Sequence, residues 1–264
     1  MHPKLVSIGS FYLPTYGVML AIAYLVAIWL LTRKAEREGL PKNEISDLSI
    51  AILAAAILGA KALLAIVDFK EYLADPHAAT ELIRSGGVFQ GGLICATIVG
   101  LWYIRKHRLP VWRITDMAAP SIALGEAIGR WGCLAAGCCY GKPTDVPWAI
   151  TFRNPFSHQA VGTPLDIPLH PTQIYLSLNA LVLFGICEWV YRHKRFDGQV
   201  FWIYVLGYAV TRGFIEEFRG DLVRGFVIPG VLSTAQFIGI LMALASIVML
   251  LVLRRRQAAA PERV

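Results

Sequence analysis

About seven long apolar segments constrain this 264-residue chain more than any other feature of its sequence. Each has roughly the 20 residues that an α-helix needs to cross a bilayer. The chain is 56% hydrophobic and only 16% charged, which is unusual for a soluble protein. We therefore predict an all-α membrane protein that forms one domain over residues 1–264. The predicted membrane spans are 13–32, 47–67, 88–104, 114–132, 171–191, 198–217 and 233–253.

Basic residues gather in alternate connections between these segments. They are Arg33, Lys34, Arg37, Lys42, Arg105, Lys106, Arg108, Arg113, Arg192, Lys194, Arg195, Arg254, Arg255, Arg256 and Arg263. The positive-inside rule then predicts an N-terminus outside and a C-terminus in the cytoplasm. Outer loops are expected at about 68–87 and 133–170, and a basic cytoplasmic tail at 254–264. The net charge of +7 is thus a sign of membrane topology, and we expect no binding of nucleic acid.

Charged and polar residues form a stripe inside the apolar segment 198–217. At 100° per residue, Tyr208, Arg212, Glu216 and Arg219 fall within about 80° of one another on a helix, whereas Glu217 falls on the opposite side. An arginine at mid-membrane depth costs roughly 2.5–3.5 kcal/mol, so such residues usually face a bundle interior or a wet cavity. Two guanidiniums with a carboxylate between them are suited to a phosphate-bearing molecule. The alternative is an internal salt bridge that joins helices.

A second basic site lies at the outer end of the span 114–132. Glu126 and Arg130 are four residues apart and can pair along a helix. Gly125, Gly129 and Gly132 carry no side chain, so another helix or a lipid headgroup can approach the backbone closely. The glycines alone are typical of helix packing, but Arg130 beside them favours a ligand site.

Two polar features have simpler structural interpretations. Asp116, near the inner start of the same span, is expected to act as an N-terminal dipole or capping partner. The outer loop 146–153 is predicted to form a short strand or a lid, with Trp148 and Phe152 at the membrane interface.

Six motifs in order resemble the prolipoprotein diacylglyceryl transferase family over nearly the whole chain. They are Pro-Thr-Tyr-Gly-Val-Met-Leu at 14–20, Gly-Gly-Val-Phe-Gln-Gly-Gly-Leu at 86–93, Ile-Thr-Asp-Met-Ala-Ala-Pro at 114–120, Gly-Arg-Trp-Gly at 129–132, His-Pro-Thr-Gln-Ile-Tyr at 170–175 and the stripe at 207–219. The resemblance implies a multi-pass enzyme of the bacterial inner membrane. It would transfer a diacylglyceryl group from phosphatidylglycerol to the lipobox cysteine of a prolipoprotein. A thioether would form and glycerol phosphate would leave, without a cofactor, and we expect a monomer.

The resemblance also implies which residues form the site. Carried over position by position, it gives Tyr16, Arg130, Gly141, Tyr208, Arg212, Glu216 and Arg219. We also expect Glu126, Gly129 and Gly132 to bind substrate. Gln90 and Gly91 of the motif at 86–93 are expected to bind substrate, and Lys61 is expected either to snorkel or to hold a second headgroup. Displacing a phosphate ester requires cations at the phosphate oxygens, which Arg130 and Arg212 can supply.

The chain departs from the family pattern at several positions. Where the family has two asparagines, a phenylalanine and a glutamate after its arginine, this chain has Cys133, Leu134, Ala136 and Cys138. Leu176 replaces a glutamate. Gln90 replaces a histidine, and a glutamine cannot act as a general base. Three alternatives stay open for deprotonation of the acceptor thiol. The base is His170, or it is Glu216 acting through a water, or the thiol ionises directly beside the arginines. Two alternative functions stay open. The protein is a paralogue that uses another acceptor, or it is a phospholipid-binding or transport protein without chemistry.

Three cysteines lie close together in the predicted outer loop, at Cys133, Cys138 and Cys139. The leading hypothesis is a disulfide from Cys133 to one of the other two. The alternatives are a zinc site that includes His170, a reactive thiol near Arg130, and plain packing of small residues. Cys95 and Cys187, inside predicted spans, are expected to be inert core residues.

Overall fold

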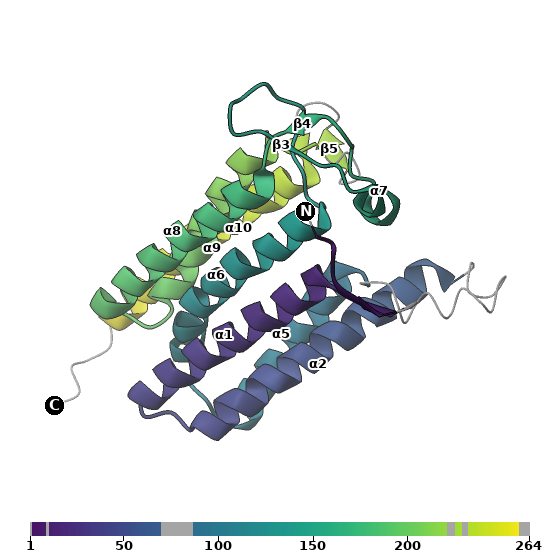
Figure 1. Ribbon diagram of the computed structural model, residues 1–264. Coiled ribbons are helices and arrows are strands. Elements are labelled where there is room, and N and C mark those ends of the chain that lie inside the picture. The colour runs from purple at the N-terminus through teal and green to yellow at the C-terminus, as the bar shows by residue number, and fades with distance from the viewer. Residues whose placement is uncertain (1, 9–10, 70–86, 221–224, 229–231, 259–264) are drawn as a thin grey trace. The chain divides into compact units, whose positions relative to one another are not determined.

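The computed structural model describes residues 2–8, 11–69, 87–220, 225–228 and 232–258 (Figure 1). The predicted outer loop 68–87 therefore lies almost wholly outside the described residues, and so does the end of the basic tail from 259 onward. The described chain is mainly helical, as the hydropathy pattern predicts.

Each predicted span coincides with a long helix. These helices are α1 (Thr15–Arg37), α2 (Lys42–Val67), α5 (Phe89–Lys106), α6 (Val111–Ala136), α8 (Thr172–His193), α9 (Gln199–Glu216) and α10 (Thr234–Ala258). By length and composition, α1, α2, α8 and α10 are apolar enough to cross a membrane. The charged side chains of α6 and α9, among them Arg130 and Arg212, lower the hydropathy of those two helices.

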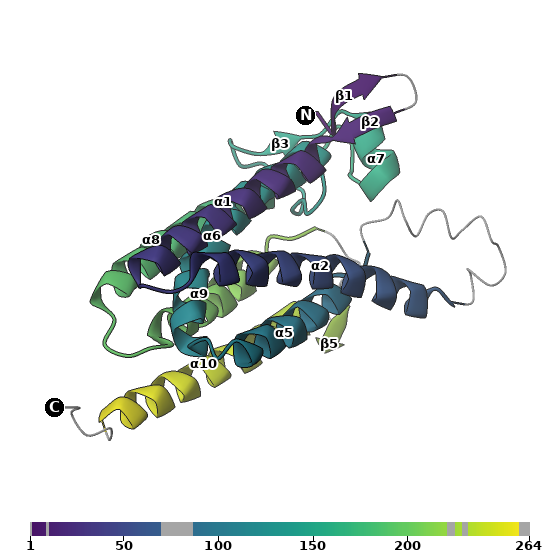
Figure 2. The same cartoon turned by 90° about the horizontal axis from the view of Figure 1, so that it is seen from below.

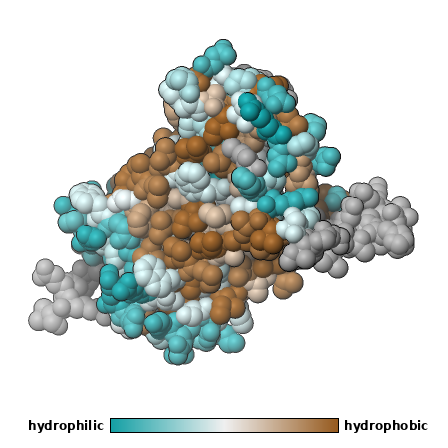
Figure 3. All heavy atoms as spheres, in the orientation of Figure 1, coloured by the Kyte–Doolittle hydropathy of each residue, from teal (hydrophilic) through white to brown (hydrophobic). Residues whose placement is uncertain are grey.

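The helices expose apolar side chains rather than burying them. Leu25 of α1, Leu58 of α2, Trp189 of α8 and Leu244 of α10 each keep more than half of their surface exposed. Figure 3 shows this as brown surface over the helices, with hydrophilic residues near their ends. Apolar surface on this scale needs a non-aqueous neighbour, and a lipid bilayer supplies one.

The chain forms two compact units. The first consists of residues 1–30 and 115–264, and the second of residues 31–114. In the second unit α2 and α5 lie side by side (Figure 2). Gly59 and Gly91 permit this contact, because a Cβ on Gly91 would lie 2.3 Å from the carbonyl oxygen of Gly59 and a Cβ on Gly59 would lie 2.5 Å from that of Gly91. Cys95 packs at the same contact, as expected for an inert residue.

The first unit is built around α6, α8 and α9, with α10 against α9. Its core contains Ala119, Ala123, Leu183, Cys187, Val190, Val200 and Tyr204. Cys187 is fully buried there, as predicted. The first part of α1 approaches α6 at Gly125, where a Cβ would lie 3.3 Å from the carbonyl oxygen of Ala23. Gly125 thus serves helix packing.

In the described part of the first unit, short strands and one short helix accompany the long helices. Three two-stranded antiparallel sheets pair β1 (Lys4–Ile8) with β2 (Phe11–Pro14), β3 (Ile150–Thr151) with β4 (Pro168–Leu169), and β5 (Phe226–Ile228) with β6 (Leu232–Ser233). α7 (Pro155–Val161) begins where the Asn154 side chain accepts a hydrogen bond from the backbone N–H of Phe156. β3 confirms the predicted short strand, and Trp148 is exposed. Phe152, however, is only 2% exposed, because it packs inside this segment instead of facing an interface.

Asp116 caps α9 and not its own helix. Its carboxylate accepts hydrogen bonds from the backbone N–H groups of Gly198 at 2.9 Å and Phe201 at 3.0 Å, and pairs with Lys194 at 3.3 Å. The two N–H groups belong to the first turn of α9, which has no partners of its own for them. The prediction that Asp116 caps a helix is confirmed, but the capped helix is α9 and not α6. Local spacing along the chain cannot predict a cap that comes from a segment distant in sequence.

We expect Asp116→Ala to lower the free energy of unfolding by about 2–4 kcal/mol, because it leaves two backbone N–H groups without their acceptor and removes one of the two carboxylates that pair with Lys194. Asp116→Asn keeps an acceptor oxygen and should cost less. Thermal unfolding in detergent micelles measures both. Equal melting temperatures for the alanine variant and the unchanged protein would contradict the capping role.

Candidate functional site

Two buried arginine–glutamate pairs define the site. On α6 the Nη2 atom of Arg130 lies 2.7 Å from Oε1 of Glu126, with both side chains under 20% exposed. On α9 the guanidinium of Arg212 donates to the carboxylate of Glu216, and these side chains are more deeply buried still. Each pair spans four residues of one helix, as the spacing predicts. Both arginines are thus salt-bridged within their own helices, whereas the alternative predicted from the sequence was a salt bridge that joins helices. The binding of a phosphate-bearing molecule stays a prediction.

Tyr208 connects the two pairs. It packs against the core shared by α6, α8 and α9, and its phenol lies within electrostatic range of the Arg130 guanidinium. The ring of Tyr204, one turn earlier on α9, lies 6.1 Å from that of Tyr208. The polar stripe of α9 therefore faces the arginine of α6. On the other side of that helix, Glu217 accepts a hydrogen bond from the Gln236 side chain.

Three backbone segments meet just beyond α6 and α9. Gly141 forms an antiparallel bridge with Arg219, and its N–H donates to the carbonyl of His170 at 3.0 Å. The next N–H, that of Lys142, donates to the carbonyl of Phe218 at 2.8 Å. A Cβ on Gly141 would lie 2.5 Å from the His170 carbonyl oxygen and 2.7 Å from that of Phe218. Glycine is required there because two other backbones occupy the space of a side chain.

His170 belongs to an aromatic group at this junction. Its Nδ1 lies 3.2 Å from the hydroxyl of Tyr175, which accepts a hydrogen bond from the Trp148 indole at 2.7 Å. Its ring meets that of Phe218 edge to face at a centroid distance of 5.2 Å. His170 therefore helps to hold the junction together, and its action as a base stays a prediction.

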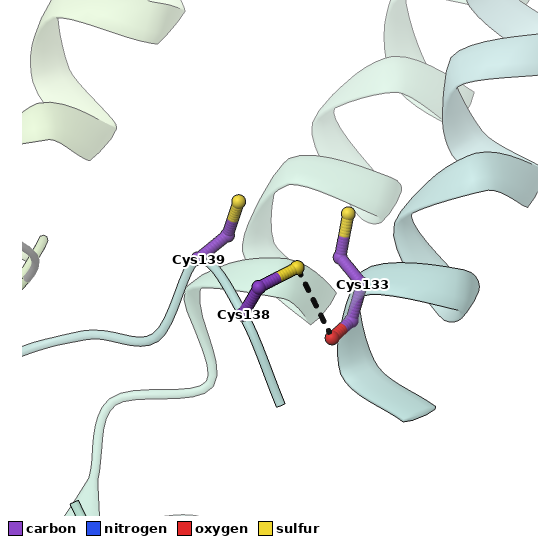
Figure 4. Close-up of side chains that lie close together, drawn as sticks. All are labelled: Cys133, Cys138 and Cys139. Atoms are coloured by element: carbon purple, nitrogen blue, oxygen red, sulfur yellow. Dashed lines mark hydrogen bonds between the residues drawn. The ribbon is translucent and has the colours of Figure 1, made fainter. Parts of the chain in front are cut away.

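The three outer cysteines converge where α6 ends (Figure 4). Their Sγ atoms all lie within 4.8 Å of one another. All five cysteines lie in the described part of the chain and are present as thiols, so the disulfide predicted from Cys133 is not formed. Cys138 instead donates a hydrogen bond to the Cys133 carbonyl at 3.8 Å. His170 is not part of this group.

The loop that carries two of these cysteines is held from α8. The side chain of Thr172 donates to the carbonyl of Cys139 at 2.6 Å, and the Gln173 amide donates to that of Cys138 at 2.7 Å. Cys139 has a φ of 60°, a left-handed conformation that is rare for a residue with a side chain. Hydrogen bonds from the Cys133 and Cys138 thiols, together with the nearby Arg219 guanidinium, lower the pKa of the Cys139 thiol well below its usual range.

The structure brings most of the predicted site residues together in the first unit. They are Tyr16, Glu126, Gly129, Arg130, Gly132, Gly141, His170, Tyr208, Arg212, Glu216 and Arg219. Tyr16 lies within electrostatic range of Arg130 and of the three outer cysteines, and its ring is 3.3 Å from where a Cβ of Gly132 would lie. A Cβ on Gly129, in contrast, would meet no atom within 4 Å.

Three predicted residues belong to the second unit. Lys61 is half-buried on α2, Gln90 is exposed in the first turn of α5, and Gly91 is buried against Gly59. The contact with Gly59 explains Gly91 as a packing residue. Its substrate-binding role and those of Lys61 and Gln90 stay predictions.

Sequence reasoning missed Tyr204 and Tyr175. Tyr204 precedes Tyr208, Arg212 and Glu216 at the same interval of four residues, so the periodicity of the stripe contained the signal to find it. Tyr175 lies in a motif that was noted, but its contacts with Trp148 and His170 depend on the folding of a long loop.

Exposed apolar helices that carry mostly buried arginine–glutamate pairs are typical of an integral membrane protein. Comparison with known proteins agrees: the chain belongs to the prolipoprotein diacylglyceryl transferase family, whose model matches residues 3–252. The resemblance seen in the six motifs is confirmed.

Relatives of the same length support this membership. The chain is 37% identical to the phosphatidylglycerol–prolipoprotein diacylglyceryl transferase of Clostridium tetani over 91% of this chain and 93% of the relative. Proteins of the same name from Vibrio cholerae and Synechococcus elongatus are 32% and 31% identical, over 95% and 90% of this chain and 90% and 82% of the relatives.

Proposed function

We propose that this protein transfers the diacylglyceryl group of phosphatidylglycerol to the lipobox cysteine thiol of prolipoproteins, the first step of lipoprotein maturation. One observation carries the proposal: two mostly buried arginines, each paired with a glutamate, lie on two helices that share a core, and Tyr208 of α9 is within electrostatic range of Arg130 on α6. Family membership, and the names of relatives that cover nearly the whole chain, support the same activity.

The arginines act on the phosphate. As sulfur attacks the glyceryl carbon, negative charge grows on the oxygens of the leaving glycerol phosphate, and guanidiniums fixed beside those oxygens stabilise that charge. Arg130 and Arg212 take this role. Glu126 and Glu216 hold the two guanidiniums in place before the lipid arrives, which avoids a reorganisation cost during the reaction. Tyr208, in the middle of α9, and Arg219, just beyond its end, are the further residues that contact the headgroup in this proposal.

Proton removal from the acceptor thiol is the other requirement, because the thiolate is the nucleophile. Gln90 cannot take that proton. Glu126 and Glu216 are each engaged with an arginine. His170 and Glu216 acting through a water remain candidates, and so does direct ionisation of the thiol near the guanidiniums.

The same proposal covers topology. Seven helices cross the bacterial inner membrane, with the N-terminus outside and the C-terminus in the cytoplasm, and the protein works as a monomer in one membrane domain. The exposed apolar side chains of the helices and the basic residues at the ends of α1, α5, α8 and α10 support this arrangement.

A purified-component assay tests the activity. The protein in vesicles of phosphatidylglycerol is mixed with a lipobox peptide, and mass spectrometry detects addition of diacylglyceryl to the cysteine. A matched peptide with serine at that position is the control and should gain no mass. Tight binding of phosphatidylglycerol without product would favour another acceptor or a lipid-binding protein without chemistry.

Gly129→Ala tests whether the open face of α6 binds lipid. A Cβ there meets no protein atom, and alanine favours a helix over glycine by up to about 1 kcal/mol, so stability should hold or rise slightly. If a headgroup approaches this backbone, the KM for phosphatidylglycerol should rise severalfold. Titration of lipid in the transfer assay, with melting temperature measured alongside, gives both values. An unchanged KM would show that the headgroup does not contact Gly129.

A further inference from the structure

The outer cysteine cluster has the donors of a metal site. Its three sulfurs come from two segments, with Cys133 in the last turns of α6 and Cys138 and Cys139 in the loop that follows (Figure 4). A zinc ion bound tetrahedrally at about 2.3 Å from each sulfur places the sulfurs about 3.8 Å apart. The observed separations, none above 4.8 Å, are within about an ångström of that geometry. Small side-chain rotations bring the sulfurs into position.

The surroundings of the cluster favour a bound cation of this kind. The carbonyls of Cys138 and Cys139 are both held by α8, which restrains the loop and keeps their side chains on one side. Thiolates select soft ions such as zinc, copper(I) and iron in iron–sulfur clusters, and mononuclear sites with three protein ligands and one further position are typical of zinc. Three thiolates around Zn²⁺ leave one net negative charge, and Arg219 lies beside Cys139 to balance it.

The fourth coordination position is available to an incoming ligand. Among the described residues, no fourth histidine, cysteine, aspartate or glutamate joins the group. The ring of His170 contacts Tyr175 and Phe218 instead. Zinc sites with three protein ligands and an open position are typical of catalytic centres, in which substrate occupies that position.

The cluster also lies next to the proposed phosphate site. Cys133 is three residues after Arg130 on α6 and lies within electrostatic range of its guanidinium. Cys138 and Cys139 are both partly exposed residues. A thiol bound at the cluster is therefore close to the cation that holds the leaving group.

We infer that Cys133, Cys138 and Cys139 bind one Zn²⁺ whose fourth ligand is the thiol sulfur of the acceptor cysteine. This inference rests on the proposed function for its catalytic part. On binding, the acceptor thiol gives its proton to water and stays on zinc as a thiolate. Its sulfur then forms the bond to the glyceryl carbon as the carbon–oxygen bond to phosphate breaks. The electron pair of that bond leaves with glycerol phosphate, whose extra negative charge balances the released proton. No oxidant or reductant is needed.

Metal analysis tests whether the three cysteines bind Zn²⁺. Protein purified without chelator, and protein reduced, stripped and reloaded with Zn²⁺, should each contain about one zinc per chain by mass spectrometry of the metal. Cys133→Ser, Cys138→Ser and Cys139→Ser should each bind zinc at least tenfold more weakly. Cys95→Ser, outside the cluster, is the matched control and should keep the metal. Reloaded protein of unchanged sequence that holds no zinc overturns the inference without the need for any variant.

Substitution with Co²⁺ makes the ligands visible. Cobalt bound by three thiolates gives sulfur-to-metal charge-transfer absorption, and the lipobox peptide should increase it by adding a fourth sulfur, whereas the serine peptide should not. X-ray absorption of the zinc form should then change from three sulfurs to four at about 2.3 Å. Failure of the cysteine peptide to alter either spectrum overturns the role of the acceptor thiol as a ligand.

The outcomes separate this inference from the proposed function. Full transfer activity in metal-stripped protein contradicts catalysis by zinc but leaves the transferase intact. A peptide sulfur bound to the metal without any diacylglyceryl product contradicts the transferase but leaves the metal site intact. Intact mass after alkylation without reductant detects a disulfide among the cluster cysteines, and a stoichiometric disulfide overturns the metal site.

Discussion

Replacing Arg130 or Arg212 with alanine is expected to slow diacylglyceryl transfer by at least a factor of about 100, since removal of one preorganised donor to a developing oxyanion typically has that effect. Lysine should also serve poorly, because an ammonium group lacks the planar fork that binds two phosphate oxygens at once. The rate with saturating phosphatidylglycerol and lipobox peptide measures the effect. Near-normal turnover by both alanine variants in folded form would refute the assignment of the site.

Controls can separate lost chemistry from lost folding. Arg130→Ala leaves the Glu126 carboxylate, which is 16% exposed, without its cation. The double variant Arg130→Ala with Glu126→Gln removes that charge, so it should recover stability but not activity. Arg153→Ala removes an arginine that is 82% exposed and pairs loosely with Asp166 at 3.9 Å, and should leave both properties unchanged.

Gly141→Ala is expected to destabilise the outer junction by about 1–3 kcal/mol or more, because the new methyl group overlaps backbone atoms that cannot rotate away. Melting temperature should fall, and limited proteolysis should cut the segment after α6 sooner. Activity should fall with it, since Arg219 pairs with Gly141 through the backbone.

Gly185→Ala provides the comparison. A Cβ on this glycine of α8 meets no atom within 4 Å, so alanine should be neutral or mildly stabilising. Equal melting temperatures for the two variants would mean that the segments around Gly141 are further apart in solution than described.

The helices and the two ion pairs were predictable because both follow from local spacing. Apolar length locates a helix, and an interval of four residues brings Arg130 to Glu126 and Arg212 to Glu216. What failed depends on contacts between distant segments. Asp116 caps α9 from 82 residues away, and the burial of Phe152 depends on a loop that returns to α8.

The cysteines show the same limit in another form. Proximity in sequence correctly predicted that Cys133, Cys138 and Cys139 lie close together, but it did not predict that they are free thiols. The sequence favoured a disulfide, whereas the structure has three free thiols in a loop held by hydrogen bonds from Thr172 and Gln173. The three residues placed in the second unit, Lys61, Gln90 and Gly91, were all predicted from family resemblance, and no local pattern predicts their contacts.

The antiparallel bridge between Gly141 and Arg219 has a consequence for lipid selection. It joins the loop after α6 to the segment after α9, so the ends of the two arginine-bearing helices are tied by backbone hydrogen bonds. The spacing of the two helices that carry Arg130 and Arg212 is therefore restrained by the fold before any ligand binds. We expect such a pair to favour a headgroup whose phosphate reaches both guanidiniums at once over a smaller or a larger anion.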